Sequence, residues 1–222
     1  MKITGITLCR LDLYQADVSG KELWCLMKII TISRQYGSGG RHIAALLSER
    51  LGVPFYDSNL LLKASDKHGI SQEIMDEFGG KTSLLYGIGM MASEEPENID
   101  RVTLPYKMYQ AQRDAMKRLA QEGPCIFVGR CADQILKEDN QLFRVFIYAS
   151  EMKDRVDRIK KNKNLSQREA LERIAYKDRQ RRDYYYFHTG QEWGRMENYD
   201  ICLNTSALSD ETCVHLLMKL AE

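Results

Sequence analysis

The residues from Arg34 to His42 have the types and spacing of a loop that binds phosphate. Gly37, Gly39 and Gly40 follow a short apolar run and precede a helical pattern. In such a loop, successive backbone N–H groups and the N-terminus of the following helix stabilise negative charge without side chains. The sequence therefore predicts a phosphate site here, and the alternative is an ordinary turn from strand to helix.

The loop departs from the usual pattern G-x-x-x-x-G-K-[ST]. In one register Arg34 replaces the first glycine, Gly40 the lysine and Arg41 the Ser/Thr that binds Mg²⁺. Shifting by one residue puts Arg41 at the lysine position and His42 at the metal position. Imidazole suits Mg²⁺ poorly, because this ion prefers oxygen ligands. We expect the loop amides, with Ser38 among them, and Arg41 to hold phosphate. His42 either contacts phosphate when protonated or faces solvent, and no residue is assigned to a metal.

Apolar periodicity and turn residues predict an alternation of strands and helices. Strands are expected at 29–33, 53–57, 125–129, 142–149 and 200–204. Helices are expected at 43–51 (with Gly52 as C-cap), from Ser58 through 60–62, at 106–121, near 132, at 166–186 behind a capping box, and at 208–220. Residues 79–102 show no clear period and are expected to form an irregular surface segment. The alternation implies a parallel sheet covered by helices on both faces.

Ligands of such sheets bind at the carboxyl ends of the strands. Arg130 directly follows a predicted strand, where its guanidinium can hold a phosphate group with two parallel hydrogen bonds; the alternative is a salt bridge to Asp133. Asp57 follows another strand and either binds a ligand or caps the next helix. Both residues are thus candidates for the binding of substrate.

Composition is ordinary for a globular protein, with 28% charged and 44% hydrophobic residues and a net charge of +1. None of the six cysteines forms a C-x-x-C pair, so a zinc site has little support. Cys125, Cys202 and Cys213 have apolar neighbours, which indicates buried, reduced thiols in a cytoplasmic protein. The N-terminus lacks a signal-peptide pattern, and the apolar run 23–27 is too short to span a bilayer.

No linker divides the chain, so residues 27–222 are expected to form one domain. Domain-like patterning begins at Met27, which makes this residue a candidate for the natural start. Residues 1–26 would then be an appendage.

Several segments carry a family resemblance: ISRQYGSGGRHIA, LGVPFYD, FVGRCAD, KDRQRRDYYYFHTGQEWG and NYDICLNTS. Together they make the chain resemble the cytidylate kinase-like family, a divergent branch of the nucleoside monophosphate kinases. The resemblance implies an α/β, three-layer P-loop kinase fold with a five-stranded parallel sheet. It also implies a helical insert that binds the nucleoside monophosphate, at about 58–122, and a helical lid at about 151–197. ATP and Mg²⁺ are the implied cofactors.

Asp178, Arg181 and Arg182 share one face of the predicted lid helix, since they are spaced i, i+3 and i+4. With the resemblance, Arg181, together with Arg179 or Arg182, is expected to close over the ATP phosphates; the alternative is a solvated helix with Asp–Arg pairs. The resemblance also implies that Arg130 holds the phosphate of the acceptor and that Asp57 binds its sugar or base. Asp178 and Arg182 are further candidates for the binding of substrate. The aromatic run 184–187 either stacks on a base or belongs to the core.

Three functions remain open at this point. The first is transfer of the γ-phosphoryl group of ATP to a nucleoside monophosphate such as CMP, or to a different small acceptor. The second is nucleotide binding without turnover, which the missing lysine motivates. The third and weakest is binding of nucleic acid through the cations between Lys153 and Arg182. Small nucleotides are the expected partners.

Overall fold

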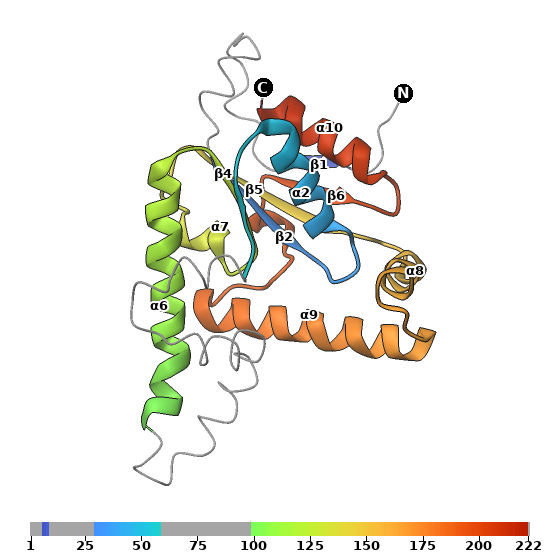
Figure 1. Cartoon of the computed structure of the whole chain (residues 1–222), viewed down its shortest axis with the longest axis horizontal. Helices are drawn as coiled ribbons and strands as arrows, with labels where there is room; N and C mark the ends of the chain where they lie inside the picture. The colour runs from blue at the N-terminus through green and yellow to red at the C-terminus, as the bar shows by residue number, and fades with distance from the viewer. Residues whose placement is uncertain (1–5, 9–28, 59–98, 222) are drawn as a thin grey trace.

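A sheet of six strands forms the centre of the computed structural model, which describes residues 6–8, 29–58 and 99–221 (Figure 1). Five of the strands are parallel neighbours in the order β6, β5, β2, β4, β3. Their bounds are β2 Ile29–Arg34, β3 Phe55–Tyr56, β4 Cys125–Val128, β5 Leu142–Tyr148 and β6 Ile201–Asn204. The predicted five-stranded parallel sheet is confirmed.

The sixth strand, β1 (Ile6–Leu8), pairs antiparallel with β6, with Ile6 opposite Leu203. The sequence did not predict this strand, because three residues are too few to show a period of two. It lies in the segment expected to be an appendage. The natural start at Met27 remains a prediction.

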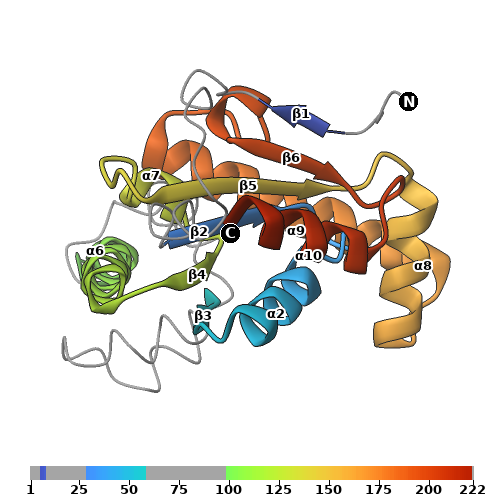
Figure 2. The same ribbon diagram turned by 90° about the horizontal axis from the view of Figure 1, so that it is seen from above.

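Helices cover both faces of the sheet because strand β2 is apolar on both sides. Ile30 and Ile32 pack in a core with α2 (Gly40–Leu51) and α10 (Asp210–Ala221), which lie together on one side of the sheet (Figure 2). Ile29 packs in a second core, with α6 (Ile99–Glu122) and α7 (Ala132–Ile135). The result is the predicted arrangement of three layers.

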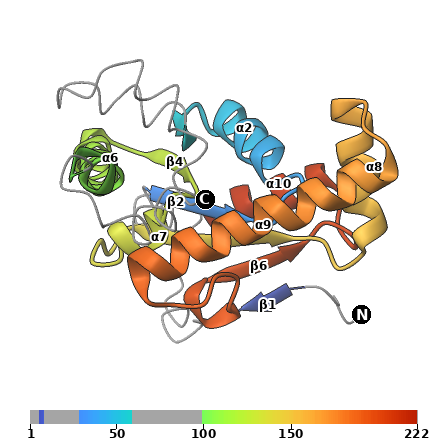
Figure 3. The same cartoon turned by 90° about the horizontal axis from the view of Figure 1, so that it is seen from below.

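Two further helices follow β5: α8 (Met152–Lys163) and α9 (Gln167–Thr189). The predicted capping box begins α9, since Ser166 and Glu169 exchange side-chain to backbone hydrogen bonds. Figure 3 shows α9 running across the molecule, and its bonds to the loop after β2 place it at the carboxyl ends of the strands. This helix therefore borders the edge where ligands of parallel sheets bind.

Some element boundaries differ from the prediction. Strand β3 contains only two of the five residues expected, and the backbone of Pro54, which has no N–H, contributes only its carbonyl, to Ile126 N. Helix α6 begins at Ile99, so the expectation of irregular structure is wrong for residues 99–102. The predicted helix at 60–62 and the rest of the 79–102 segment lie outside the described residues. A short 3₁₀ helix, Met196–Asn198, precedes β6.

Cys125, Cys202 and Cys213 are buried thiols outside any disulfide, as predicted. Burial raises the pKa of Cys125 to about 12 and that of Cys213 to about 11, and nearby carboxylates add to both shifts. These thiols therefore act as small apolar side chains in the core.

Candidate active site

Hydrogen bonds within the loop and to strand β5 hold the loop between β2 and α2 in place. Ser38 is buried, and its hydroxyl donates to the carbonyls of Gln35 at 2.9 Å and Ile147 at 3.0 Å. Gln35 N also donates to Ile147 O at 3.0 Å. Gly37 and Gly39 both have a φ of +84°, which residues with a side chain rarely adopt. The loop is therefore fixed before any ligand binds.

The open side of the loop is the N-terminus of α2. Gly39 caps this helix without a side-chain hydrogen bond, and the first amides of an α-helix have no acceptor within the helix. These amides face a groove that Gly37, Gly39, Gly40, Arg41 and His42 line together with residues of α8. The structure thus brings five of the predicted phosphate-binding residues to one groove, and His42 among them is exposed. Ser38 does not line this groove, because its hydroxyl is turned inward to the carbonyls of Gln35 and Ile147.

Asp178, on α9, contacts the loop through its carboxylate. Its carboxylate accepts a hydrogen bond from Tyr36 N at 2.7 Å and pairs with Arg155. Arg155 in turn donates from Nε to Tyr36 O at 2.8 Å. Asp178 had been predicted to bind substrate, but its contacts fasten α9 to α8 and to the loop, and it does not line the cavity described below.

The three arginines of α9 that were predicted to contact ATP differ in their contacts and exposure. Arg181 donates from Nη1 to Arg34 O at 2.8 Å. Burial lowers the pKa of Arg181 to about 10, against an opposing effect of Asp178. Arg179 and Arg182 are exposed, and Arg182 lines a separate surface groove with Tyr186. Arg181 is therefore the member of this set that the structure brings to the loop.

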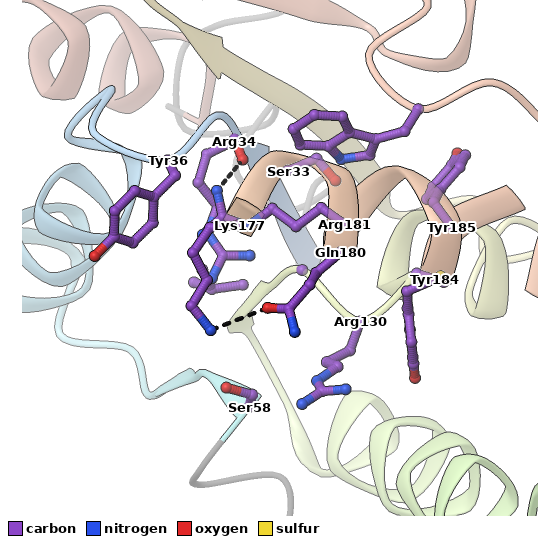
Figure 4. A pocket seen from close by; sticks show the side chains of 14 residues that line it. Ser33, Arg34, Tyr36, Ser58, Arg130, Lys177, Gln180, Arg181, Tyr184 and Tyr185 are labelled. Carbon is purple, nitrogen blue, oxygen red and sulfur yellow. Dashed lines mark hydrogen bonds between the residues drawn. The ribbon is translucent and has the colours of Figure 1, made fainter. Parts of the chain in front are cut away.

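A cavity of about 260 Å³ lies between the loop, the end of β4 and α9. In Figure 4 the polar ends of Lys177, Gln180 and Arg130 extend into the same space, and Ser58 lies across from them. Four cationic side chains belong to the lining, which consists of Ser33, Arg34, Tyr36, Ser58, Val128, Gly129, Arg130, Cys131, Lys177, Gln180, Arg181, Tyr184, Tyr185 and Trp193.

These cations repel one another. Burial is the main cause of the low pKa of Arg34, and the charges of Arg181 and Arg130 lower it further. The pKa of Lys177 is also lowered, chiefly by burial and then by the neighbouring arginines. Since one pKa unit corresponds to about 1.4 kcal/mol between the protonation states, this arrangement of the cavity is unfavourable for its own charges. An anion of high charge density would relieve this repulsion.

Arg130 reaches the cavity from a strained turn at the end of β4. Arg130 and Cys131 both have a φ of +58°, after Gly129 at +77°. Such strain in residues other than glycine often accompanies a functional site. The guanidinium of Arg130 lies 5.1 Å from the centroid of the Tyr184 ring, which supports its position. The prediction that Arg130 contacts an acceptor phosphate fits this location.

The alternative partner predicted for Arg130, Asp133, is engaged elsewhere. The Asp133 carboxylate accepts a hydrogen bond from the Tyr185 hydroxyl at 2.6 Å, and both side chains are buried. The aromatic run is divided: Tyr184 and Tyr185 both line the cavity, whereas Tyr186 and Phe187 are exposed. The Tyr185 hydroxyl is engaged by Asp133, and the Tyr184 ring lies under the Arg130 guanidinium.

Arg41 and Asp57, predicted to serve different ligands, contact each other. Arg41 donates to Asp57 Oδ2 at 2.9 Å from both Nε and Nη2. The side chain of Arg41 is 65% exposed and that of Asp57 is 7% exposed. In this arrangement the arginine points along the end of β3, near Phe55.

Sequence reasoning missed Arg34 and Lys177. Arg34 was noted only as a replacement for a glycine, although it ends the strand that leads into the loop. Lys177 is four residues before Arg181 on α9, so the helical period could have placed both on one face. The sequence positions of Arg34 and Lys177 are therefore informative, but only the relative orientation of β2 and α9 shows that both side chains face the cavity.

The described residues also limit what cofactors can bind to side chains. No group of three metal-ligating side chains occurs among them, and none of their helices has the length and apolar character needed to cross a membrane. His42 offers nitrogen where a hydroxyl usually binds Mg²⁺, so the loop itself does not fit this ion. The amides at the start of α2 fit a phosphate group.

Comparisons with known proteins agree with this fold. Residues 29–207 match the model of the cytidylate kinase-like family. A cytidylate kinase from Methanothrix thermoacetophila is 29% identical over 178 residues, which cover 80% of this chain and 88% of the relative. The crystal structure of an uncharacterized protein from Eubacterium ventriosum superposes with a TM-score of 0.67 at 22% identity, over 87% of this chain and 97% of the other.

Proposed function

Because the chain belongs to the cytidylate kinase-like family of P-loop kinases, we propose that it transfers the γ-phosphoryl group of ATP to a nucleoside monophosphate, most simply CMP. The relative that is 29% identical bears the name cytidylate kinase, which supports CMP as the first acceptor to try. Arg130 and Arg181 are the proposed catalytic arginines; Arg41, the third arginine expected from the sequence, could act in this way only after leaving Asp57. Small nucleotides are the proposed partners, and nucleic acid is not expected.

The observation that carries this proposal is the adjacency of two binding spaces. The groove at the start of α2 offers backbone amides for the phosphates of a donor. The cavity beside it presents Arg130, Lys177 and Arg181, which suit an acceptor that carries its own phosphate. A reaction between two phosphorylated molecules needs this combination of positioning and charge neutralisation.

In the proposed reaction, an oxygen of the acceptor phosphate forms a bond to the γ-phosphorus of ATP. The bond between this phosphorus and the β,γ-bridging oxygen breaks, and ADP leaves with the electron pair. An ionised acceptor oxygen needs no general base. Arginine side chains that reach the γ-phosphoryl group stabilise the charge on its oxygens during transfer.

Magnesium is the expected companion of ATP, and it would neutralise charge on the β- and γ-phosphates when bound. Since the loop offers His42 instead of a hydroxyl, the ion would be held by the phosphate oxygens and water. The role of the residues in this chain would then be to orient ATP, through the backbone amides of Gly39, Gly40 and the residues that follow. Arg179 and Arg182 would approach the nucleotides only if α9 rotated.

One observation favours the second candidate, a protein that binds nucleotide without turnover. Arg41, which stands at the lysine position in one register, donates to Asp57 at 2.9 Å. If this pair persists with ATP bound, the loop lacks its usual cation at the γ-phosphoryl group.

Release of ADP from Mg·ATP separates the two functions. Purified protein would be assayed with CMP, dCMP, UMP, AMP, GMP and no acceptor, with Arg130→Ala as the control for contaminating kinases. Turnover that depends on an acceptor and falls at least about 100-fold in the variant establishes the kinase and names its substrate. No turnover with any acceptor, together with ATP binding by calorimetry, would establish the binding protein.

A further inference from the structure

Arg34 lies at the boundary between the groove and the cavity. It is the last residue of β2, and together with Tyr36 and Arg181 it lines both spaces. If the donor phosphates occupy the groove and the acceptor occupies the cavity, the transferred group crosses this boundary. A side chain at the boundary can contact the phosphoryl group on either side.

The guanidinium of Arg34 is buried and incompletely satisfied. Its Nε is shielded from solvent and has no hydrogen-bond partner within the described residues. The group lies against Gly129, where an added Cβ would overlap Arg34 Nη1. A buried donor without an acceptor is costly, so its retention needs an explanation.

The charges that face Arg34 do not supply that acceptor. Arg181, Arg130 and Arg41 lower the pKa of Arg34, while Asp57 raises it. Asp57, however, accepts its described hydrogen bond from Arg41. The balance of charge around Arg34 is therefore positive, and an anion would offset it.

Arg41 is less suited to contact a phosphoryl group at this boundary. It is 65% exposed, it is held by Asp57, and it lines the groove but not the cavity. To reach the boundary it would have to leave Asp57, whose carboxylate would stay buried. Arg34 needs no such rearrangement.

We propose that Arg34 takes the role of the lysine that is missing from this variant loop, by contacting the γ-phosphoryl group of the bound triphosphate before and during its transfer. The proposal rests on the proposed phosphoryl transfer. As the acceptor oxygen bonds to phosphorus and the bridging bond breaks, the guanidinium neutralises charge on the oxygens of the moving group. Arg181 assists from α9, while Arg41 and Asp57 keep the loop joined to β3.

The test compares Arg34→Met and Arg41→Met with a matched control, Arg168→Met, whose arginine is 86% exposed near the start of α9. Calorimetry would measure the binding of inorganic tripolyphosphate, and then of ATP, to each protein. Arg34→Met is expected to weaken tripolyphosphate at least about tenfold, because a charge-assisted hydrogen bond to phosphate is lost. Arg41→Met is expected to weaken it less than about threefold, and the control should match the wild type.

A melting experiment without anions shows whether Arg34 has a merely structural role. Removing a cation that its neighbours repel should leave Tm unchanged or raise it, and Arg34→Lys should recover part of the tripolyphosphate affinity. Unchanged tripolyphosphate binding by Arg34→Met would overturn the proposal. A markedly lower Tm, or failure of this variant to fold, would also overturn it, because both show that the cation stabilises the fold.

Turnover gives an independent comparison. With the acceptor that the wild type uses, Arg34→Met should lower kcat about 100-fold or more while the KM of the acceptor changes little. If the wild type phosphorylates no acceptor, the proposed kinase function fails, but the tripolyphosphate measurements still decide whether Arg34 is the cation of the loop.

Discussion

Arg41 and Asp57 form an ion pair at 2.9 Å that joins the phosphate loop to the end of β3. Sequence reasoning treated the arginine as a ligand of ATP and the aspartate as a ligand of the acceptor. The pair instead links the two residues mechanically, so the position of the loop depends on the position of β3. It also gives the buried carboxylate of Asp57 a cationic partner.

A double-mutant cycle with Arg41→Met and Asp57→Asn should detect this link. We expect a coupling free energy of about 0.5–1 kcal/mol, since Arg41 is largely exposed and water weakens the attraction. Urea unfolding of the four proteins at pH 7 would measure it. Strictly additive changes in the free energy of unfolding would show that the pair does not form in solution.

The buried pair of Asp178 and Arg155 should matter much more. Asp178→Asn leaves the Arg155 charge without its carboxylate, in a position where both side chains are largely buried. We expect the free energy of unfolding to fall by about 3 kcal/mol, because the buried Arg155 charge loses its counter-ion, and the Kd of ATP to rise, because Tyr36 N is left with a neutral, weaker acceptor. Asp183→Asn, an exposed substitution on the same helix, is the control and should change stability by less than about 0.5 kcal/mol. Equal effects of the two variants would contradict this account of Asp178.

The sequence was sufficient for the sheet but not for the directions of the charged side chains. Runs such as 125–128 are apolar throughout, and only a strand buried on both faces satisfies such a run. By contrast, Arg179, Arg181 and Arg182 are equivalent in a helical pattern that is charged on most sides. Their roles separate only when the contact of α9 with Arg34 and Tyr36 fixes the rotation of the helix. β1 was missed because its stability comes from the edge of β6 and not from its own pattern.

His188 should make the protein less stable in mild acid. Its ring is stacked 3.8 Å from Tyr109 by centroid distance and lies beside the Tyr184 and Phe187 rings; burial and then the charge of Arg130 lower its pKa to about 4. Between pH 6.5 and 4 the unfolded chain therefore binds a proton that the folded chain does not, so stability falls as the pH falls. With allowance for the part of the ring that is open to water, we expect a loss of about 1–2 kcal/mol across this window.

This loss should disappear when the imidazole is replaced. His188→Phe keeps an aromatic ring against Tyr109, so its free energy of unfolding should depend less on pH than that of the wild type. Urea titrations at pH 7 and pH 5 would measure the difference between the two slopes. His215→Phe, at an exposed position on α10, is the matched control and should retain the wild-type slope.

We expect that glycine is needed at position 129 for two reasons: its backbone conformation and the space that it leaves for the Arg34 guanidinium. Both Gly129 and Gly52 have positive φ values, +77° and +67°, so alanine strains the backbone at either site by about 1 kcal/mol. At Gly52 the new Cβ meets nothing within 4 Å, whereas at Gly129 it overlaps the Arg34 guanidinium. Gly52→Ala is therefore expected to lower Tm slightly and leave tripolyphosphate binding unchanged, while Gly129→Ala should weaken that binding about tenfold because Arg34 is displaced. If the two alanine variants bind tripolyphosphate equally well, the space that Gly129 leaves for Arg34 has no part in anion binding.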